Sequence, residues 1–149
     1  MKSHLFSHHP TAPVVVREPP PAEAVGRWSA GFLLGLHGAV HGMGLVLLWR
    51  LAEPGTLRYT DAAPDPGTAA GYLAGAGWLT AGVAFVVGAF LLVRRDHRWL
   101  PVTTAAAIVS LLLISLMAAQ APVGVAVDAV TLVICAALWI RRDRLRAAA

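Results

Sequence analysis

Four long apolar segments, separated by short polar stretches, dominate the pattern of hydrophobic and polar positions along the chain. They cover residues 28–51, 69–93, 100–119 and 122–140. As helices, segments of about 19 to 25 residues measure roughly 28 to 37 Å, which matches the ~30 Å hydrocarbon core of a bilayer. The segments do not alternate strictly, so barrel strands are not indicated, and in lipid the backbone must satisfy its own hydrogen bonds. The pattern predicts an all-α bundle of four transmembrane helices.

The composition supports this interpretation. Of 149 residues, 57% are hydrophobic and only 13% are charged, and that charged share is about half the usual value for a soluble domain. These values exclude a disordered chain and disfavour an ordinary water-soluble domain. The single cysteine, Cys135, cannot form an internal disulfide, and the chain has no CxxC motif for redox exchange or zinc binding.

The polar regions at both ends define the expected domain organisation. Residues 1–26 are predicted to be a disordered cytoplasmic tail, because the run Pro19–Pro21 removes backbone donors and fixes φ. Residues 27–141 then form the four-helix membrane domain. Residues 142–149 form a short basic cytoplasmic tail.

The basic residues predict the orientation in the membrane. The net charge is +4, and most of the arginines lie at the ends of apolar segments. That placement follows the positive-inside rule, so we interpret the charge as a topology signal and exclude nucleic acid as a partner. The chain is predicted to be a multi-pass protein of the bacterial cytoplasmic (inner) membrane with both termini inside. This orientation places ten basic residues inside, Lys2, Arg17, Arg27, Arg94, Arg95, Arg98, Arg141, Arg142, Arg144 and Arg146, and two outside, Arg50 and Arg58.

The first apolar segment carries a stripe of glycines that indicates close helix packing. Gly31, Gly35, Gly38 and Gly42 follow one another at spacings of four, three and four residues, so they share one helix face. Glycine lets helix backbones approach closely in a membrane. The stripe is compatible with contacts inside one chain, with a homo-oligomer or with a larger membrane complex. The lipid bilayer itself is the other expected partner.

His37 and His41 lie one turn apart on one face of the same segment. Ionisable groups inside a membrane are costly and usually face the bundle interior. Three alternatives follow: the imidazoles bind a metal ion or haem, they take part in proton or quinone chemistry, or they are neutral residues that fix helix packing. Two histidines alone do not complete a zinc site, which needs at least a third ligand.

Asp128 is the only acid inside an apolar segment. Counting residues from the segment ends places Asp128 about 9 Å and His41 about 14 Å below the outer surface. We therefore predict a His41–Asp128 contact in a polar pocket, with His37 one turn deeper and Gln120 close enough to join. The alternative is that Asp128 reaches the outer water or caps a local turn.

Three hydroxyl residues, Ser110, Ser115 and Thr131, also lie in apolar segments. In a membrane such residues bond back to their own helix or across to a neighbouring one. No acid–base arrangement near them indicates a hydrolase. The sequence contains no complete catalytic motif and leaves open whether the protein is an enzyme.

The chain carries several short motifs: Leu36-His37-Gly38, followed by His41 and Gly42, then Trp49-Arg50-Leu51-Ala52-Glu53 and Tyr59-Thr60. Together they resemble a group of small, largely uncharacterised four-span integral membrane proteins of actinobacteria. The likeness covers most of the chain after about residue 28, and Gly124 and Asp128 fit the start of that group's last helix. A more distant likeness is to DoxX-type proteins, which have four spans and often a His-Gly pair in the first helix. That resemblance implies redox chemistry at the membrane, linked to quinones or thiols.

The leading functional prediction is a small integral membrane protein that acts through helix–helix association, as an accessory or scaffolding component. The first alternative is a membrane redox or proton-handling protein that uses His37, His41 and Asp128, with haem, a metal ion or a quinone as cofactor. The second alternative is a small transporter subunit, which the shortage of membrane-embedded charges opposes.

Overall fold

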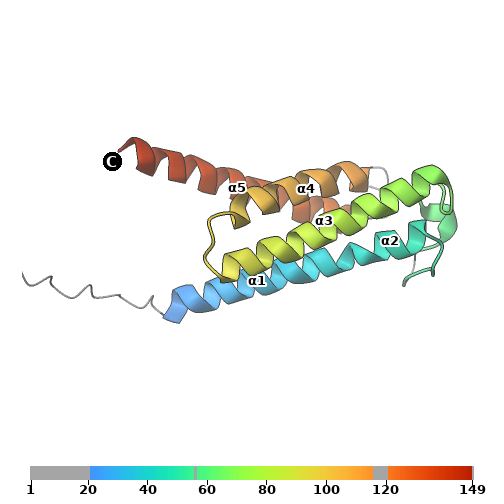
Figure 1. Cartoon of the computed structure of the whole chain (residues 1–149), viewed down its shortest axis with the longest axis horizontal. Coiled ribbons are helices and arrows are strands. Elements are labelled where there is room, and N and C mark those ends of the chain that lie inside the picture. Colours follow the sequence, from blue (N-terminus) through green and yellow to red (C-terminus); the bar gives the residue numbers. More distant parts are fainter. Residues whose placement is uncertain (1–20, 56, 116–120, 149) are drawn as a thin grey trace, which may run out of the picture.

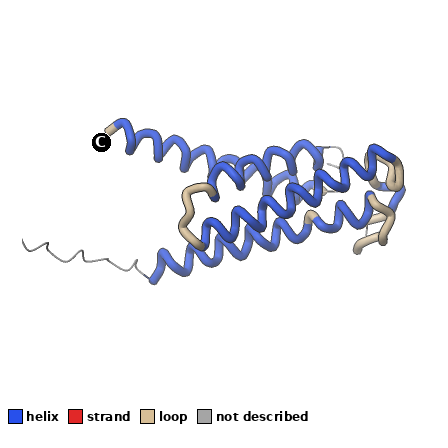
Figure 2. Tube along the Cα trace, viewed as in Figure 1, coloured by secondary structure: helices blue, strands red, loops and turns tan. Residues whose placement is uncertain are grey.

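The computed structural model describes residues 21–55, 57–115 and 121–148, and in these ranges the chain is helical with connecting loops and no strand (Figure 2). Helices α3 and α5 begin at the first residue of their predicted segments. The elements in chain order are α1 (Pro21–Val40), α2 (Gly42–Leu48), the short 3₁₀ helix η1 (Tyr59–Asp61), α3 (Ala69–Val93), α4 (Trp99–Ser115) and α5 (Pro122–Ala147).

Three helical stretches are long and apolar enough to cross a membrane: Ala22–Leu48, Ala69–Val93 and Pro122–Ala147. Such candidate spans imply contact with a lipid bilayer. Helix α4 is also apolar but has 17 residues, or about 26 Å at 1.5 Å per residue. The all-α prediction is confirmed, and four helices pack together. Part of the predicted third span, residues 116–119, lies outside the described residues.

The long helices pack one after another, and the first and the last of the series do not pack closely on each other. Helix α1 packs against α3, α3 against α4, and α4 against α5, while α1 and α5 are not among the closely packed pairs. Figure 1 shows that the beginning of α1, the turn between α3 and α4, and the end of α5 lie at one end of the bundle. Helices α1 and α5 are therefore the first and last members of this packing series.

The glycine stripe of the first segment packs inside the chain. A Cβ built on Gly38 would lie 2.7 Å from the backbone oxygen of Gly82 in α3, which leaves no room for a side chain, and a Cβ on Gly31 would lie 2.7 Å from a side-chain methyl group of Val93 at the end of α3. Gly35 is in ordinary contact with α3, and nothing lies within 4 Å of a Cβ built on Gly42. Two of the four glycines thus require close contact with α3, a helix of the same chain.

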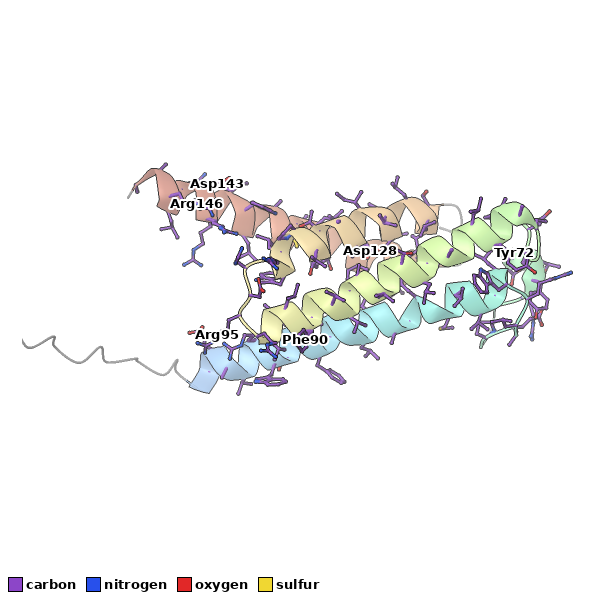
Figure 3. All side chains as sticks on the ribbon, viewed as in Figure 1. Tyr72, Phe90, Arg95, Asp128, Asp143 and Arg146 are labelled. Atoms are coloured by element: carbon purple, nitrogen blue, oxygen red, sulfur yellow. The ribbon has the colours of Figure 1, made fainter. Side chains whose placement is uncertain are left out.

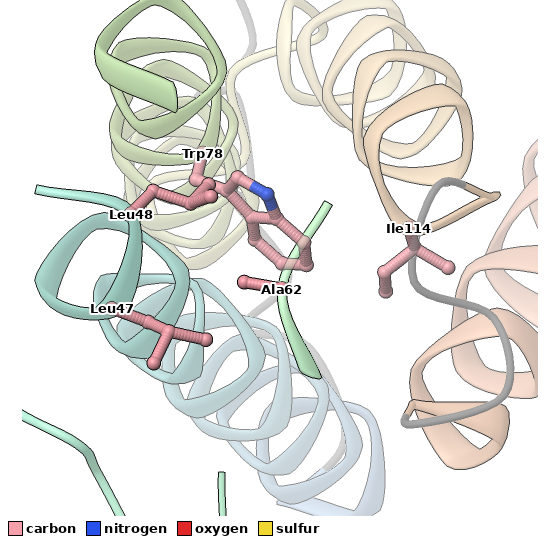
Figure 4. Packing of buried hydrophobic residues seen from close by; sticks show 5 residues of the cluster. All are labelled: Leu47, Leu48, Ala62, Trp78 and Ile114. Atoms are coloured by element: carbon pink, nitrogen blue, oxygen red, sulfur yellow. The ribbon is translucent and has the colours of Figure 1, made fainter. Parts of the chain in front are cut away.

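An apolar cluster closes the end of the bundle opposite to the C-terminus. Leu47 and Leu48 of α2, Trp78 of α3 and Ile114 of α4 are buried there together with Ala62 (Figure 4). Ala62 belongs to the segment between α2 and α3. This segment therefore folds back over the helix ends instead of extending away from them.

Three helix boundaries differ from the sequence-based prediction. The first helix begins at Pro21, inside the predicted tail 1–26, because proline at the first helical position loses no hydrogen bond. The same stretch ends at Leu48 instead of residue 51. The last helix continues through the predicted basic tail to Ala147, since arginine is a good helix former. Residues 1–20 lie outside the described part of the chain.

Candidate functional site

Four polar side chains from different parts of the chain meet midway along the bundle. They are His37 of α1, His41 between α1 and α2, Ser110 of α4 and Asp128 of α5, and we call them the polar cluster. Figure 3 shows Asp128 midway along the helices, far from the C-terminal end of α5. His41, Ser110 and Asp128 are at most 1% exposed, and the His37 side chain is 14% exposed.

Hydrogen bonds join the polar cluster into a closed ring. His37 Nε2 lies 2.8 Å from Asp128 Oδ1, and Asp128 Oδ2 lies 2.5 Å from Ser110 Oγ. Ser110 Oγ lies 2.6 Å from His41 Nε2. His41 Nδ1 lies 2.9 Å from the backbone carbonyl oxygen of His37, which completes the ring.

The side chain of His41 explains the break between α1 and α2. In a regular helix the His37 carbonyl accepts the backbone N–H of residue 41. Here the imidazole of His41 bonds that carbonyl, and the His41 N–H bonds Gly38 O at 3.2 Å instead. The Gly44 N–H likewise bonds His41 O, three residues back, at 3.1 Å. The turn is therefore tightened toward 3₁₀ geometry at the residue that enters the polar cluster.

The structure brings together His37, His41 and Asp128, and the direct hydrogen-bond partner of Asp128 is His37 instead of His41. Asp128 bonds His37 directly and reaches His41 only through the Ser110 hydroxyl. Counting residues from segment ends locates a side chain only to about one helical turn, or ~5 Å. His37 and His41 differ by one turn, so that count could not select between them. Gln120 lies outside the described residues.

Ser110 is the member of the polar cluster that sequence reasoning did not identify. The sequence allowed each hydroxyl residue to bond either back to its own helix or across to another. Ser115 Oγ donates to Leu112 O at 2.6 Å and Thr131 Oγ1 donates to Val127 O at 2.8 Å, so both bond back. The Ser110 hydroxyl instead bonds His41 and, on α5, Asp128. Its central position in the third segment is the only sequence signal that could have distinguished it.

Aromatic rings of α3 enclose the polar cluster. The Phe85 ring centroid lies 4.7 Å from that of His37 and 5.2 Å from that of His41. Trp78 lies against His41 at 5.2 Å. In such apolar surroundings a satisfied hydrogen bond is strong and an unsatisfied polar group is costly. The number of hydrogens that these hydrogen bonds need therefore constrains the protonation of the polar cluster.

The hydrogens can be counted bond by bond. The His37 carbonyl can only accept, so His41 must donate to it through Nδ1–H. The other three bonds also need one hydrogen each, and the Ser110 hydroxyl provides one of them. If Asp128 were ionised and both imidazoles neutral, one bond among Asp128, Ser110 and His41 would lack its hydrogen. All four bonds together require one more proton, which brings the net charge of the polar cluster to zero.

Two proton arrangements satisfy every bond at this net charge. In the first, a neutral Asp128 donates to Ser110, and Ser110 donates to His41 Nε2. In the second, a doubly protonated His41 donates to Ser110, and Ser110 donates to the Asp128 carboxylate. The two arrangements differ by two proton shifts along contacts of 2.5 and 2.6 Å. In both, His37 donates to Asp128 through Nε2–H.

The same side chains were candidates for holding a metal ion. One ligand atom from each of His37, His41 and Asp128 can be chosen so that all lie within 4.8 Å of one another. However, both nitrogens of His41, Nε2 of His37 and both oxygens of Asp128 already take part in the hydrogen-bonded ring. An ion would have to replace these bonds. The arrangement therefore suits a bound proton better than a metal ion.

Two cavities flank the polar cluster, and His37 and Val127 line both. The cavity on the side of Trp99 has a volume of about 450 Å³, and the cavity on the side of Trp78 has about 420 Å³. We call them the Trp99 cavity and the Trp78 cavity. His37 is thus the member of the polar cluster that borders both spaces, whereas His41 borders only the second.

Comparison with protein-family models, curated proteins and solved structures found no match to this chain. The resemblance to actinobacterial four-span proteins and to DoxX-type proteins therefore stays a prediction. The function has to be argued from the site.

Proposed function

We propose that the chain is a multi-pass membrane protein that holds and exchanges a proton at the polar cluster. The observation that carries this proposal is the hydrogen count: the four bonds among His37, Asp128, Ser110 and His41 need one proton beyond an ionised aspartate and two neutral imidazoles. The two arrangements that meet this need have the same net charge. A proton can therefore move between Asp128 and His41 without separating charge from the cluster as a whole.

Membrane energetics favour retention of this proton. A charged side chain near the bilayer centre costs about 2.5 to 3.5 kcal/mol on insertion scales. Asp128 is fully buried, so the extra proton removes the net charge that an ionised carboxylate would bring. Exchange with the surroundings would occur at His37 Nδ1, because His37 is the most exposed member of the polar cluster, at 14%, and its Nε2 is engaged by Asp128.

The proposed orientation places both termini on the cytoplasmic side of a bacterial inner membrane. Arg94, Arg95 and Arg98 lie at the turn between α3 and α4, at the same end of the bundle as the basic end of α5 (Figure 1). Arg50 and Arg58 belong to the segment at the opposite end. This distribution agrees with the positive-inside rule.

Helix association as an accessory or scaffolding component is the second candidate function. The observation that favours it is the sparse packing of α5. This helix packs closely on α4, and its apolar stretch of 18 residues is only 11% buried. The glycines that suggested this role are partly used inside the chain, since Gly31 and Gly38 pack on α3. Disulfide cross-linking of a Val133→Cys variant, at a side chain 69% exposed, would test for a second copy. A transporter subunit, the remaining alternative, could use the same proton as its coupling ion.

The proton count can be tested directly by NMR on the isotope-labelled protein in lipid bilayers at neutral pH. The carboxyl carbon of Asp128 and the ring nitrogens of His37 and His41 report their protonation. We expect either a neutral Asp128 or a doubly protonated His41. An ionised Asp128 beside two neutral imidazoles would overturn the proposal.

A pair of serine variants on α4 provides the matched control. Ser110→Ala removes the bridge between Asp128 and His41, so the carboxyl signal of Asp128 should change. Ser115 is exposed and bonds its own helix, so Ser115→Ala should leave that signal unchanged. Equal effects of the two variants would show that Asp128 does not share a proton with the ring.

A further inference from the structure

The Trp99 cavity lies between helices that do not pack closely on each other. Residues of α1, among them Leu33 and Leu34, line one side, and residues of α5, among them Ile134 and Leu138, line the other. Helices α1 and α5 are not a closely packed pair. A molecule dissolved in the lipid could therefore enter sideways between them, and a volume of about 450 Å³ falls in the range of pockets that hold small molecules.

The uncharged lining of the Trp99 cavity favours an uncharged ligand. Among the described residues, no Asp, Glu, Lys or Arg lines the Trp99 cavity, and its walls are aliphatic and aromatic apart from His37, two threonines and Cys135. A charged ligand would lose its hydration there without an opposite charge to compensate. Of the polar side chains, Thr131 donates its hydroxyl to Val127 O, and the hydroxyl oxygen of Thr103, although it has no partner in the described residues, is buried and so is not open to a ligand. His37 remains, and only its Nε2 is engaged, by Asp128.

The proton arrangement of the polar cluster determines what Nδ1 of His37 can bind. In both arrangements His37 is neutral and donates through Nε2 to Asp128, so Nδ1 carries a lone pair and acts only as an acceptor. A ligand that bonds His37 must therefore donate a hydrogen. An uncharged lipophilic molecule with a hydroxyl group meets both conditions, whereas an ether or a ketone of the same shape does not.

We propose that the Trp99 cavity binds a lipid-soluble hydroxyl compound, with its O–H donated to His37 Nδ1 and its apolar part between α1 and α5. This inference rests on the proposed function only in that the ligand would bond the cluster that holds the proton, because the acceptor character of Nδ1 needs just a neutral His37 that donates through Nε2 to Asp128. It goes further by assigning a ligand class and a binding place. The ligand would contact the polar cluster at the one nitrogen where the cluster can exchange a proton.

The Trp78 cavity fits this ligand less well. The segment between α2 and α3 contributes Leu57 to its wall and covers that end of the bundle. The additional polar group there, His41, has both ring nitrogens engaged in hydrogen bonds. His37 and residues of α1 and α5 border both cavities, and the Trp99 cavity is preferred because the residues described as lining it all belong to helices, with no loop across it.

The test uses para-dodecylphenol and its methyl ether, which has the same shape but no donor. Binding to the full-length protein in bilayers is followed by the nitrogen NMR signal of His37 Nδ1. We expect the phenol to shift this signal and to bind about tenfold more tightly than the ether, as one hydrogen bond allows. Equal binding of the two probes with no shift at His37 would overturn the inference. Dodecanol is a third probe, and its affinity relative to the phenol identifies the ligand as aromatic or aliphatic.

Two variants on α1 locate the ligand without changing the polar cluster. Ala30 lines the Trp99 cavity and Val40 lines the Trp78 cavity, and both side chains are exposed. Ala30→Trp should weaken phenol binding about tenfold or more by filling the first cavity, and Val40→Trp should not. The opposite result would contradict the assignment to the Trp99 cavity.

The two proposals can fail separately. The protonation of Asp128 and His41 is read from their own NMR signals in the ligand-free protein. If these signals show the extra proton but the phenol and the ether bind equally, the proton-holding function stands and the ligand inference is wrong. If the extra proton is missing, the proton-holding function is wrong, and the ligand inference is decided by its own binding test, because a neutral His37 that donates to an ionised Asp128 still has an acceptor at Nδ1.

Discussion

Gly38 of α1 and Gly82 of α3 face each other so closely that each occupies the place of the other's side chain. A Cβ on Gly38 would lie 2.7 Å from the carbonyl oxygen of Gly82, and a Cβ on Gly82 would lie 2.7 Å from that of Gly38. The Cβ built on Gly82 would also lie 3.1 Å from the Cβ of His41. The crossing of α1 and α3 thus sets the rotation of the helix that carries both histidines.

Gly38→Ala should therefore destabilise the bundle. The added methyl group would meet backbone of α3 and the Cβ of Phe85 at 2.9 Å, and overpacking of this kind costs about 1 to 3 kcal/mol. The measurement is the midpoint of denaturation in mixed micelles. Gly42→Ala is the matched control, because nothing lies within 4 Å of a Cβ there. Equal losses in the two variants would mean that the crossing is looser than described.

Asp128→Asn should preserve the fold although it removes the buried carboxyl group. The amide oxygen can accept from His37 Nε2, and the amide N–H can donate to Ser110, which then donates to His41. All four bonds of the uncharged arrangement survive, so we expect a change in the free energy of unfolding below about 1 kcal/mol.

Asp128→Ala provides the contrast at the same position. It leaves His37 and Ser110 without their partner in the bundle interior, and each buried unsatisfied group costs about 1 to 3 kcal/mol. Thermal or detergent-induced unfolding would measure both variants. A loss for Asp128→Asn as large as that for Asp128→Ala would show that the carboxyl group itself is needed for the fold.

Thr103→Val should be neutral or stabilising. The hydroxyl of Thr103 is buried and has no hydrogen-bond partner in the described part of the chain. A Cβ on Gly88 would lie 2.5 Å from this oxygen, so the hydroxyl packs against the backbone of α3. Valine has nearly the same shape and removes a group that costs about 1 to 3 kcal/mol when unsatisfied. The comparison is Thr104→Val, whose hydroxyl donates to Leu100 O at 2.8 Å. If Thr103→Val is the more damaging change in a denaturation series, the oxygen has a partner.

The orientation can be tested by labelling cysteine variants in intact cells with a membrane-impermeant maleimide. Thr60→Cys, in the segment over the α2 end of the bundle, should react from outside. His97→Cys, in the turn between α3 and α4, should react only after the membrane is permeabilised. Both positions are exposed. The native Cys135 is only 2% exposed, so its own reaction with the maleimide should be slight. The reverse labelling pattern would place the termini outside.

The helical, membrane-compatible character of the chain could be predicted from sequence because it depends on properties of single residues. The predicted bounds of α3, residues 69–93, are those observed. Hydropathy is a transfer free energy that adds along a segment, and membrane-length helices follow from summing it. The cost of a buried Asp128 is also a property of one residue, so the need for polar partners was predictable.

The identity of those partners depends on distances that a segment does not contain. His37 and His41 are equivalent by residue type and share one helix face, yet only His37 bonds Asp128 directly. Ser110 and Ser115 are equivalent by type as well, and only Ser110 bridges two helices. Helix rotation, set by contacts such as the one between Gly38 and Gly82, selects among them. The sequence by itself determined apolar helices with a polar interior, and only the tertiary structure decided which polar side chains bond one another there, because hydrogen bonding requires atoms of different helices within about 3 Å.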